Sequence, residues 1–165
     1  MLAHRAKILL LAATLLTWAE SAQAGTAQTS MNVSATVQSS CLVSATAMAF
    51  GSYDPVSTTA ATATSSITVT CTTGTSFVVG LNAGTASGAT VATRQMSNAS
   101  QRLAYALFSD SGRTTNWGNT AGVDVPAAIT ATTTPSVLTV YGRIAAEQNV
   151  PAGAYADVVT ITVTY

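Results

Sequence analysis

Apolar and polar positions alternate along residues 157–165 of this 165-residue chain. Val159, Ile161, Val163 and Tyr165 share one face of the extended segment, and the positions between them are mostly threonine. This period of two predicts a half-buried β-strand. Such a strand needs a neighbour or a cover at both edges, because unpaired N–H and C=O groups beside a hydrophobic row attract another chain. The pattern therefore raises the question of which segment lies beside this strand.

Further runs with the same alternation predict strands at residues 66–71, 76–82, 102–110 and 136–144. The threonine-rich residues 56–66 are predicted to be a loop that leads into the first of these strands. Glycine and asparagine occupy the gaps. Serine and threonine supply 43 of the 141 residues after Ala24, and no long helical stripe of apolar residues occurs there. The sequence therefore predicts an all-β fold, a sandwich of about seven short strands.

Another alternating segment precedes the first cysteine. Met31, Val33, Ala35 and Val37 alternate with polar residues, so this segment can place one apolar face against a partner. It is either the first strand of its own domain or a strand that packs elsewhere. The periodicity agrees with both.

The first 24 residues have the organisation of a secretory signal peptide. His4, Arg5 and Lys7 form a basic start, residues 8–16 form an apolar run too short to cross a bilayer, and residues 22–24 (Ala-Gln-Ala) suit a signal peptidase. A membrane anchor is the alternative, and the shortness of the run disfavours it. We expect cleavage after Ala24 and a mature chain of one domain that does not insert into a membrane.

Removal of this segment limits the chemistry of the chain. The only histidine and the only lysine leave with it, and four arginines remain against five acidic residues. Histidine-based catalysis is therefore excluded, and no basic patch is available for the phosphates of nucleic acid. No nucleophile motif and no phosphate-binding glycine loop occurs. We expect no enzyme activity, no cofactor, no metal site and no nucleic-acid partner.

Two cysteines remain, Cys41 and Cys71, separated by 30 positions. In an exported chain, such a pair predicts a disulfide. A loop of this length would stabilise the fold by about 3 to 4 kcal/mol on the chain-entropy account. Zinc binding by the two thiolates is disfavoured, because a histidine partner and the usual spacing are missing.

Three other residues that could carry chemistry are assigned to packing and turns. Trp117 is predicted to lie in the core or at a groove rim rather than to stack on a sugar. Asp110 and Asp124 are 14 positions apart and lack a general acid or base partner. They are predicted to serve turns.

A set of short motifs runs along nearly the whole chain after Ala24. The set is NVSATVQSSC at 32–41, FGSY at 50–53, ITVTC at 67–71, LAYALFSD at 103–110, WG at 117–118, VYGRI at 140–144 and PAGAYADVVTITVTY at 151–165. Together with the signal peptide and both cysteines, this ordered set resembles the spore coat protein U family, which includes the pilin subunits of archaic chaperone-usher pili.

The resemblance implies an incomplete immunoglobulin-like sandwich that lacks its final strand and is completed by a donor strand from another chain. It implies a signal peptide at 1–24, an N-terminal donor-strand extension at 25–39 and an immunoglobulin-like pilin domain at 40–165. The donor strand would present Met31, Val33, Ala35 and Val37. The acceptor groove, where the chaperone also binds, would be lined by Val159, Ile161, Val163 and Tyr165. Complementation between chaperones and pilins is an established case of β-strand addition.

The implied function is that of a structural subunit of a surface pilus. Its expected partners are copies of itself or related pilins, a periplasmic chaperone and an outer-membrane usher. The chain would pass through the periplasm to the cell surface, where the filament would support adhesion or biofilm formation. One alternative is a self-complemented coat protein of a spore or cell surface, with its own N-terminal strand folded back. Another, a secreted hydrolase, is disfavoured by the missing histidine and the lack of clustered acids.

Overall fold

The computed structural model describes residues 23–165. The described residues fall into two units, 23–35 and 36–165. Residues 1–22 of the predicted signal peptide lie outside the described part, so cleavage after Ala24 stays a prediction. The alternating residues 31–37 are not a strand in this structure. A strand forms only where a neighbour supplies hydrogen bonds, so the alternation by itself does not make these residues a strand.

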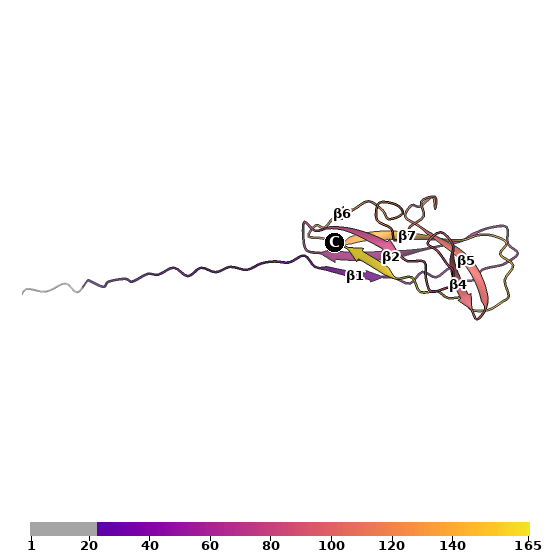
Figure 1. The fold of residues 1–165 in the computed structure, drawn as a ribbon, viewed down its shortest axis with the longest axis horizontal. Helices are drawn as coiled ribbons and strands as arrows, with labels where there is room; N and C mark the ends of the chain where they lie inside the picture. Colours follow the sequence, from indigo (N-terminus) through magenta and orange to yellow (C-terminus); the bar gives the residue numbers. More distant parts are fainter. Residues whose placement is uncertain (1–22) are drawn as a thin grey trace, which may run out of the picture. The chain divides into compact units, whose positions relative to one another are not determined.

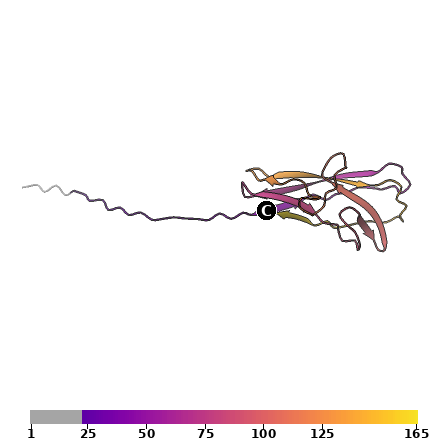
Figure 2. The same ribbon diagram turned by 45° about the horizontal axis from the view of Figure 1, so that its top comes forward.

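The second unit consists of strands and, within residues 36–165, contains no helix (Figure 1). Its eight strands are β1 (Cys41–Ala45), β2 (Ala61–Cys71), β3 (Ser76–Leu81), β4 (Arg94–Asn98), β5 (Gln101–Phe108), β6 (Ile129–Thr130), β7 (Ser136–Ile144) and β8 (Ile161–Thr164). A five-stranded sheet has the order β1-β2-β7-β5-β4, and a three-stranded sheet has the order β6-β3-β8. All paired strands are antiparallel. The predicted all-β sandwich is confirmed, and the turned view shows its two layers (Figure 2).

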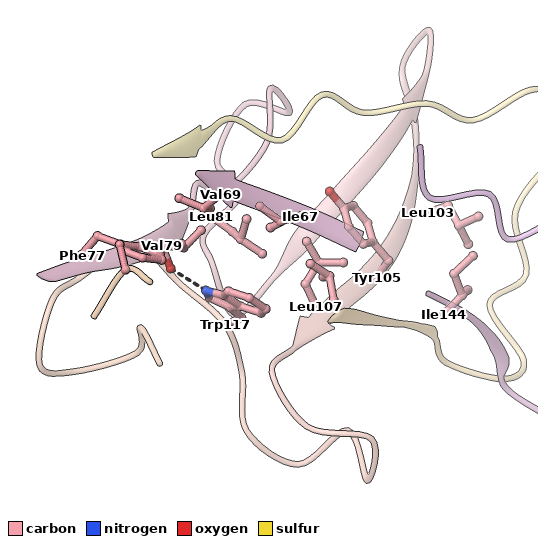
Figure 3. Packing of buried hydrophobic residues seen from close by; sticks show 12 residues of the cluster. Ile67, Val69, Phe77, Val79, Leu81, Leu103, Tyr105, Leu107, Trp117 and Ile144 are labelled. Atoms are coloured by element: carbon pink, nitrogen blue, oxygen red, sulfur yellow. Dashed lines mark hydrogen bonds between the residues drawn. The ribbon is translucent and has the colours of Figure 1, made fainter. Parts of the chain in front are cut away.

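The core lies between the two sheets and takes side chains from both (Figure 3). Alternate residues of β3 face it, as the period of two predicted. The buried members from the longer strands are Ile67, Val69, Phe77, Val79, Leu81, Leu103, Tyr105, Leu107, Val140 and Ile144. The strands predicted at 76–82, 102–110 and 136–144 are therefore confirmed as β3, β5 and β7, within two residues at their ends.

Trp117 belongs to this core, as predicted. Its side chain is 1% exposed, and its indole Nε1 donates a 2.7 Å hydrogen bond to the carbonyl oxygen of Val79 (Figure 3). Both the ring and its polar atom are therefore used in packing.

The two aspartates serve turns, as predicted. The carboxylate of Asp110 accepts hydrogen bonds from the backbone N–H groups of Thr114 and Thr115. The carboxylate of Asp124 accepts a 2.7 Å hydrogen bond from the N–H of Thr120. Each aspartate accepts hydrogen bonds from the backbone of its own loop. Aspartate is common in turns because its side chain makes such local hydrogen bonds.

The prediction of a loop at residues 56–66 is wrong in its second half. Strand β2 begins at Ala61, five residues before the predicted start. Residues 61–69 form a continuous antiparallel ladder with β7, which pairs Ala61 with Ile144 and Val69 with Ser136. Threonine and serine are compatible with a strand when a long neighbour supplies the hydrogen bonds. Tertiary pairing therefore extends the strand beyond its apolar residues.

The C-terminal strand is shorter than predicted. Strand β8 begins at Ile161, and residues 157–160 carry no strand. Its partner β3 ends at Leu81, which pairs with Ile161. Beyond this point one backbone bond remains, from the N–H of Asn82 to Thr160 O. The side chain of Asn82 supplies the other acceptor, because its Oδ1 accepts hydrogen bonds from the N–H groups of Thr160 and Gly84.

Candidate functional site

Both sheets end in strands that have a free edge. Among the described residues, β1 is hydrogen-bonded only to β2, and β8 only to β3. Ala45 at the end of β1 and Ile161 at the start of β8 line one common cavity. The two free edges therefore border the same opening, and both ribbon views place β1 and β8 side by side (Figures 1 and 2).

Val43 shows that the sandwich is open at this edge. It lies directly opposite Val69 in the β1–β2 pair, so the two side chains point to the same face of the sheet. Val69 is 1% exposed, whereas Val43 is 45% exposed. The inner face of the sheet is covered over β2 and uncovered over β1.

A cavity of about 440 Å³ continues this opening along the sandwich. One wall comes from residues 45–50 and the other from residues 155–161. The floor consists of core side chains from β2, β3, β5 and β7, among them Ile67, Leu81 and Val140. Apart from Ala45 and Ile161, the wall residues belong to no strand. The cavity is therefore an apolar groove with largely irregular walls, and an isolated antiparallel bridge between Ala156 and Ser97 joins one wall to β4.

A second cavity of about 600 Å³ extends the groove toward the far end of the sandwich. It is lined by residues 48–53 and 150–155 and by side chains such as Leu103 and Ile144. Four side chains line both cavities, and these are Met48, Phe50, Met96 and Tyr155. We call the two cavities together the edge groove.

One polar cluster lies in the edge groove. The hydroxyl of Tyr105 donates a 2.7 Å hydrogen bond to Oδ2 of Asp157. Oδ1 of Asp157 accepts 2.8 Å hydrogen bonds from the N–H and hydroxyl of Thr85 and from the N–H of Val158. The carboxylate packs so closely on Gly84 that a Cβ at position 84 would overlap it, and Gly84 has a φ of +86°. The carboxylate thus ties the groove wall to the β3–β4 loop and to the groove floor.

Hydrogen bonding determines the ionisation of this cluster. Burial raises the pKa of the Asp157 carboxyl, but hydrogen bonds from Thr85, Tyr105 and Val158 outweigh it and hold the pKa below its usual value. The pKa of Tyr105 is raised, first by burial and then by its hydrogen bond to Asp157. At neutral pH the pair is a carboxylate and a neutral phenol.

The structure places the four predicted groove residues differently. Val159 and Ile161 line the edge groove. Val163 is half-buried and pairs with Val79 in the ladder with β3. Tyr165 follows the end of β8 and is 58% exposed. The first two therefore lie in the groove, and the last two lie beyond the cavity along the same edge.

Sequence reasoning missed the opposite wall of the groove. Met48 and Phe50 line both cavities, and the phenyl ring of Phe50 makes an edge contact with Tyr105 at a centroid distance of 6.3 Å. The alternation of Met48 and Phe50 with Ala47 and Ala49 was a usable signal. It was missed because two apolar positions are too few to predict an element.

The described donor-segment residues are exposed in their own units. Met31 and Val33 of the first unit are 83% and 82% exposed, and Val37 of the second unit is 83% exposed. Contiguous exposed apolar surface is a general feature of sites that bind a partner.

The first residues of the second unit are fixed to the end of β2. Cys41 and Cys71 form a disulfide, which confirms the predicted pairing. The N–H of Thr72 donates a 2.9 Å hydrogen bond to Ser40 O, and the N–H of Ser40 donates a 3.1 Å hydrogen bond to Thr72 Oγ1. Thr72 Oγ1 also donates to Gln38 O at 3.4 Å.

In residues 23–165, no group of three or more His, Cys, Asp or Glu side chains is placed to hold a metal ion. No helix in this part of the chain is long and apolar enough to cross a membrane.

Comparison with known proteins agrees with this architecture. Protein U of Myxococcus xanthus is 36% identical over 159 residues, which cover 87% of this chain and 88% of that protein. A solved structure is also similar, with a TM-score of 0.58 at 23% sequence identity. It is the CsuC-CsuE chaperone-tip adhesion subunit pre-assembly complex from the archaic chaperone-usher Csu pili of Acinetobacter baumannii. The match covers 79% of this chain and 40% of that chain, and it shows a shared immunoglobulin-like fold.

The profile of the Spore Coat Protein U domain matches residues 27–162, which include the donor segment, both cysteines and the edge groove. The chain therefore belongs to the Spore Coat Protein U domain family.

Proposed function

We propose that the protein is a structural subunit of a surface pilus, assembled by the chaperone-usher pathway through exchange of donor strands. The observation that carries this proposal is the edge groove. Val43 faces the interior beside a fully buried neighbour and is still 45% exposed. An inward-facing side chain of this kind requires an occupant, since the free edges of β1 and β8 can each pair with one further strand.

The occupant is the N-terminal extension of another copy. Alternate residues of a strand are about 6.6 to 6.8 Å apart, so residues 31–37 present four apolar side chains in a row. Their burial would contribute roughly 5 to 10 kcal/mol before hydrogen bonds to the free edges are counted. This value is comparable with the stability of a whole domain, about 5 to 15 kcal/mol. A subunit without a donor is therefore marginal, and each joint between subunits is tight.

The same logic defines the partners. A periplasmic chaperone covers the groove first, and at an outer-membrane usher the extension of the next subunit replaces it. Because each subunit donates to one neighbour and accepts from another, the contact does not close on itself and builds a filament. The filament lies on the cell surface, where it supports adhesion or biofilm formation. After removal of residues 1–24, the chain needs no membrane insertion and no enzyme activity for this role.

Hydrogen bonds at the root of the extension favour donation over self-complementation. To enter its own groove, the extension would reverse direction within residues 38–40 and run back beside β1, as in a hairpin with a short loop. The bonds between Ser40 and Thr72 and from Thr72 to Gln38 hold these residues against the end of β2. Folding back would break them. A self-complemented coat protein is therefore the second candidate, and a hydrolase has no supporting residues.

A rearranged chain tests the proposal. Residues 31–37 are moved behind a short Gly/Ser linker after Tyr165, and the original residues 25–37 are removed. The donor is then present in the same chain at high effective concentration. We expect a soluble monomer that needs no chaperone and unfolds in one step, measured by size-exclusion chromatography and thermal melting.

Two substitutions in the rearranged chain serve as a matched pair. Val33→Asp places a carboxylate in the apolar groove and should lower the free energy of unfolding by at least the lost valine burial, about 1.5 to 3 kcal/mol. Ser34→Asp changes the opposite face of the donor strand and should have little effect. If the rearranged chain aggregates while the unmodified mature chain is a stable monomer, the coat-protein alternative holds instead.

A further inference from the structure

The methionines that remain after Ala24 are Met31, Met48 and Met96. Met31 lies in the donor segment, and Met48 and Met96 line both cavities of the edge groove. Every methionine of the processed chain therefore belongs to the proposed joint between subunits. Methionine is polarizable and flexible, which suits a groove that accepts one occupant and then another.

The two groove methionines lie on the inner face of the main sheet. Met96 in β4 pairs with Leu103 of β5, which is buried. The sulfur of Met48 lies over the backbone of Gly142 in β7, where a Cβ would overlap it. Both side chains are only half-buried. Because both residues also line the cavities, small solutes reach the two side chains in a subunit whose groove is empty.

We propose that Met48 and Met96 form an oxidant-sensitive modification site whose substrate is a two-electron oxidant such as hydrogen peroxide. The thioether sulfur attacks one peroxide oxygen, the O–O bond breaks, and an S–O bond forms. The sulfur loses two electrons, and the departing hydroxide takes the proton from the new S–OH group, so the products are the sulfoxide and one water molecule. The reaction needs no metal and no catalytic residue. This inference rests on the proposed function, because its consequence falls on donor binding.

Oxidation places a strong polar group in an apolar groove. The methionine sulfoxide oxygen would meet the apolar donor face without a hydrogen-bond partner, and methionine sulfoxide disrupts methionine-rich interfaces generally. Donor binding should become weaker by about tenfold or more. A docked donor strand covers the same sulfur atoms, so oxidation is fast before assembly and slow afterwards. The site makes assembly, rather than the finished filament, sensitive to oxidant.

The experiment uses the full mature chain as a monomer fraction and as a polymer. Both are treated with the same dose of hydrogen peroxide, digested, and analysed by mass spectrometry for a single added oxygen on each methionine. We expect Met48 and Met96 to be oxidised at least about tenfold more slowly in the polymer. Equal rates in the two samples would overturn the inference.

Binding of a synthetic peptide of residues 25–37 with Met31→Leu measures the consequence. Fluorescence anisotropy should show about tenfold weaker binding to the oxidised monomer, and methionine sulfoxide reductase should restore the affinity. The Met48→Leu/Met96→Leu chain keeps side-chain volume, so it should bind the peptide equally well before and after peroxide. If the monomer that carries both sulfoxides binds the peptide as tightly as the untreated monomer, the inference is overturned and the proposed function is not. Failure of the untreated monomer to bind the peptide overturns the proposed function, and the inference with it.

Discussion

The hydroxyl of Tyr105 donates a 2.7 Å hydrogen bond to Oδ2 of Asp157, and this bond joins the floor of the edge groove to its wall. Asp157 begins the segment that carries Val159 and Ile161 along the groove. The same carboxylate is bonded to Thr85 in the loop after β3. One side chain therefore fixes the position of the wall against two other parts of the sandwich.

The pH dependence of stability should report this bond. The pKa of Asp157 is lower in the folded chain than its usual value, so its contribution is present above the unfolded pKa of about 3.9 and is lost as pH falls through the folded pKa. Asp110 also has a lowered pKa and adds to the same acid loss. Thermal melting between pH 7 and pH 2.5 should therefore show a falling Tm below about pH 4.

Two variants separate Asp157 from Asp110. Asp157→Asn should make the fall in Tm at acidic pH smaller than in the parent chain. Tyr105→Phe should also make this fall smaller, while the ring keeps its contact with Phe50. Tyr105→Phe should also cost about 1.5 to 3 kcal/mol at neutral pH, the range for a hydrogen bond to a charged group. The idea fails if Asp157→Asn leaves the difference in Tm between neutral and acidic pH unchanged.

Val43 and Leu42 are neighbours in β1 with opposite orientations. Val43 faces the groove opposite buried Val69, and Leu42 pairs with the exposed Thr70 on the outer face. Val43→Asp should therefore abolish assembly, because a carboxylate would be buried beside the donor strand. Leu42→Asp is the matched control and should assemble normally. Filaments are counted by electron microscopy on cells that express each variant. Equal numbers for Val43→Asp and Leu42→Asp would show that the β1 edge is not part of the joint.

Ile161 and Thr162 offer the same comparison on the other wall. Ile161 lines the groove, and Thr162 is exposed. Ile161→Asp should prevent both chaperone and donor binding, so the subunit should be lost to proteolysis in the periplasm. Thr162→Asp should accumulate normally. Immunoblots of periplasmic extracts measure both, and normal accumulation and assembly of Ile161→Asp would place the joint elsewhere.

The sequence predicts best where the chain pairs with itself. Phe77, Val79 and Leu81 occupy alternate positions, and all three are buried in β3 as this spacing indicates. Here the local pattern and the tertiary contacts agree, because both faces of the strand have a fixed environment within the unit.

Arg94 shows why β4 was not predicted. It begins the strand RQMSN, whose polar composition suggests a loop. Yet its side chain is fully buried, and its guanidinium donates hydrogen bonds to the carbonyl oxygens of Leu81, Asn82, Val91 and Trp117. Three of these four carbonyl groups lie 12 or more positions away in the sequence, so the buried cation leaves no periodic signal.

The groove was predicted only in part for a related reason. Period-two alternation marks Val159 and Ile161 as one apolar face. A groove, however, exists because a neighbouring strand is missing, and a residue pattern does not show which strands are missing. The opposite wall at residues 46–50 forms no strand, and its two large apolar residues, Met48 and Phe50, are too few for their alternation to predict an element. Only the three-dimensional arrangement brings Met48 and Phe50 opposite Val159.

The disulfide should contribute mainly to the stability of the subunit. Cys41 and Cys71 are bonded where β1 begins and β2 ends, across a separation of 30 positions. The Cys41→Ala/Cys71→Ala chain should lose about 3 to 4 kcal/mol on the chain-entropy account. Urea unfolding of the rearranged monomer, with and without the bond, measures this loss. A midpoint equal to that of the parent would mean that the β1–β2 ladder alone holds the strand.

Thr72 should direct the extension away from its own groove. Its hydroxyl accepts a hydrogen bond from the N–H of Ser40 and donates to Gln38 O. Thr72→Val keeps the shape of the side chain and the bond from its own N–H to Ser40 O, but removes the hydrogen bonds of the hydroxyl with Ser40 and Gln38. Residues 38–40 are then held by fewer hydrogen bonds, so they form the loop of a hairpin more readily. Size-exclusion chromatography of the mature chain should show a larger monomer fraction and less polymer.

Two controls identify this monomer. Thr73→Val changes the adjacent exposed threonine and should leave the ratio of monomer to polymer as in the parent chain. Val33→Asp added to Thr72→Val should destabilise the monomer in thermal melting, because a folded-back donor places Val33 in the subunit's own groove. If Thr72→Val polymerises as well as the parent chain, the hydroxyl bonds do not set the direction of the extension, and the choice between donation and self-complementation is made by the donor strand itself.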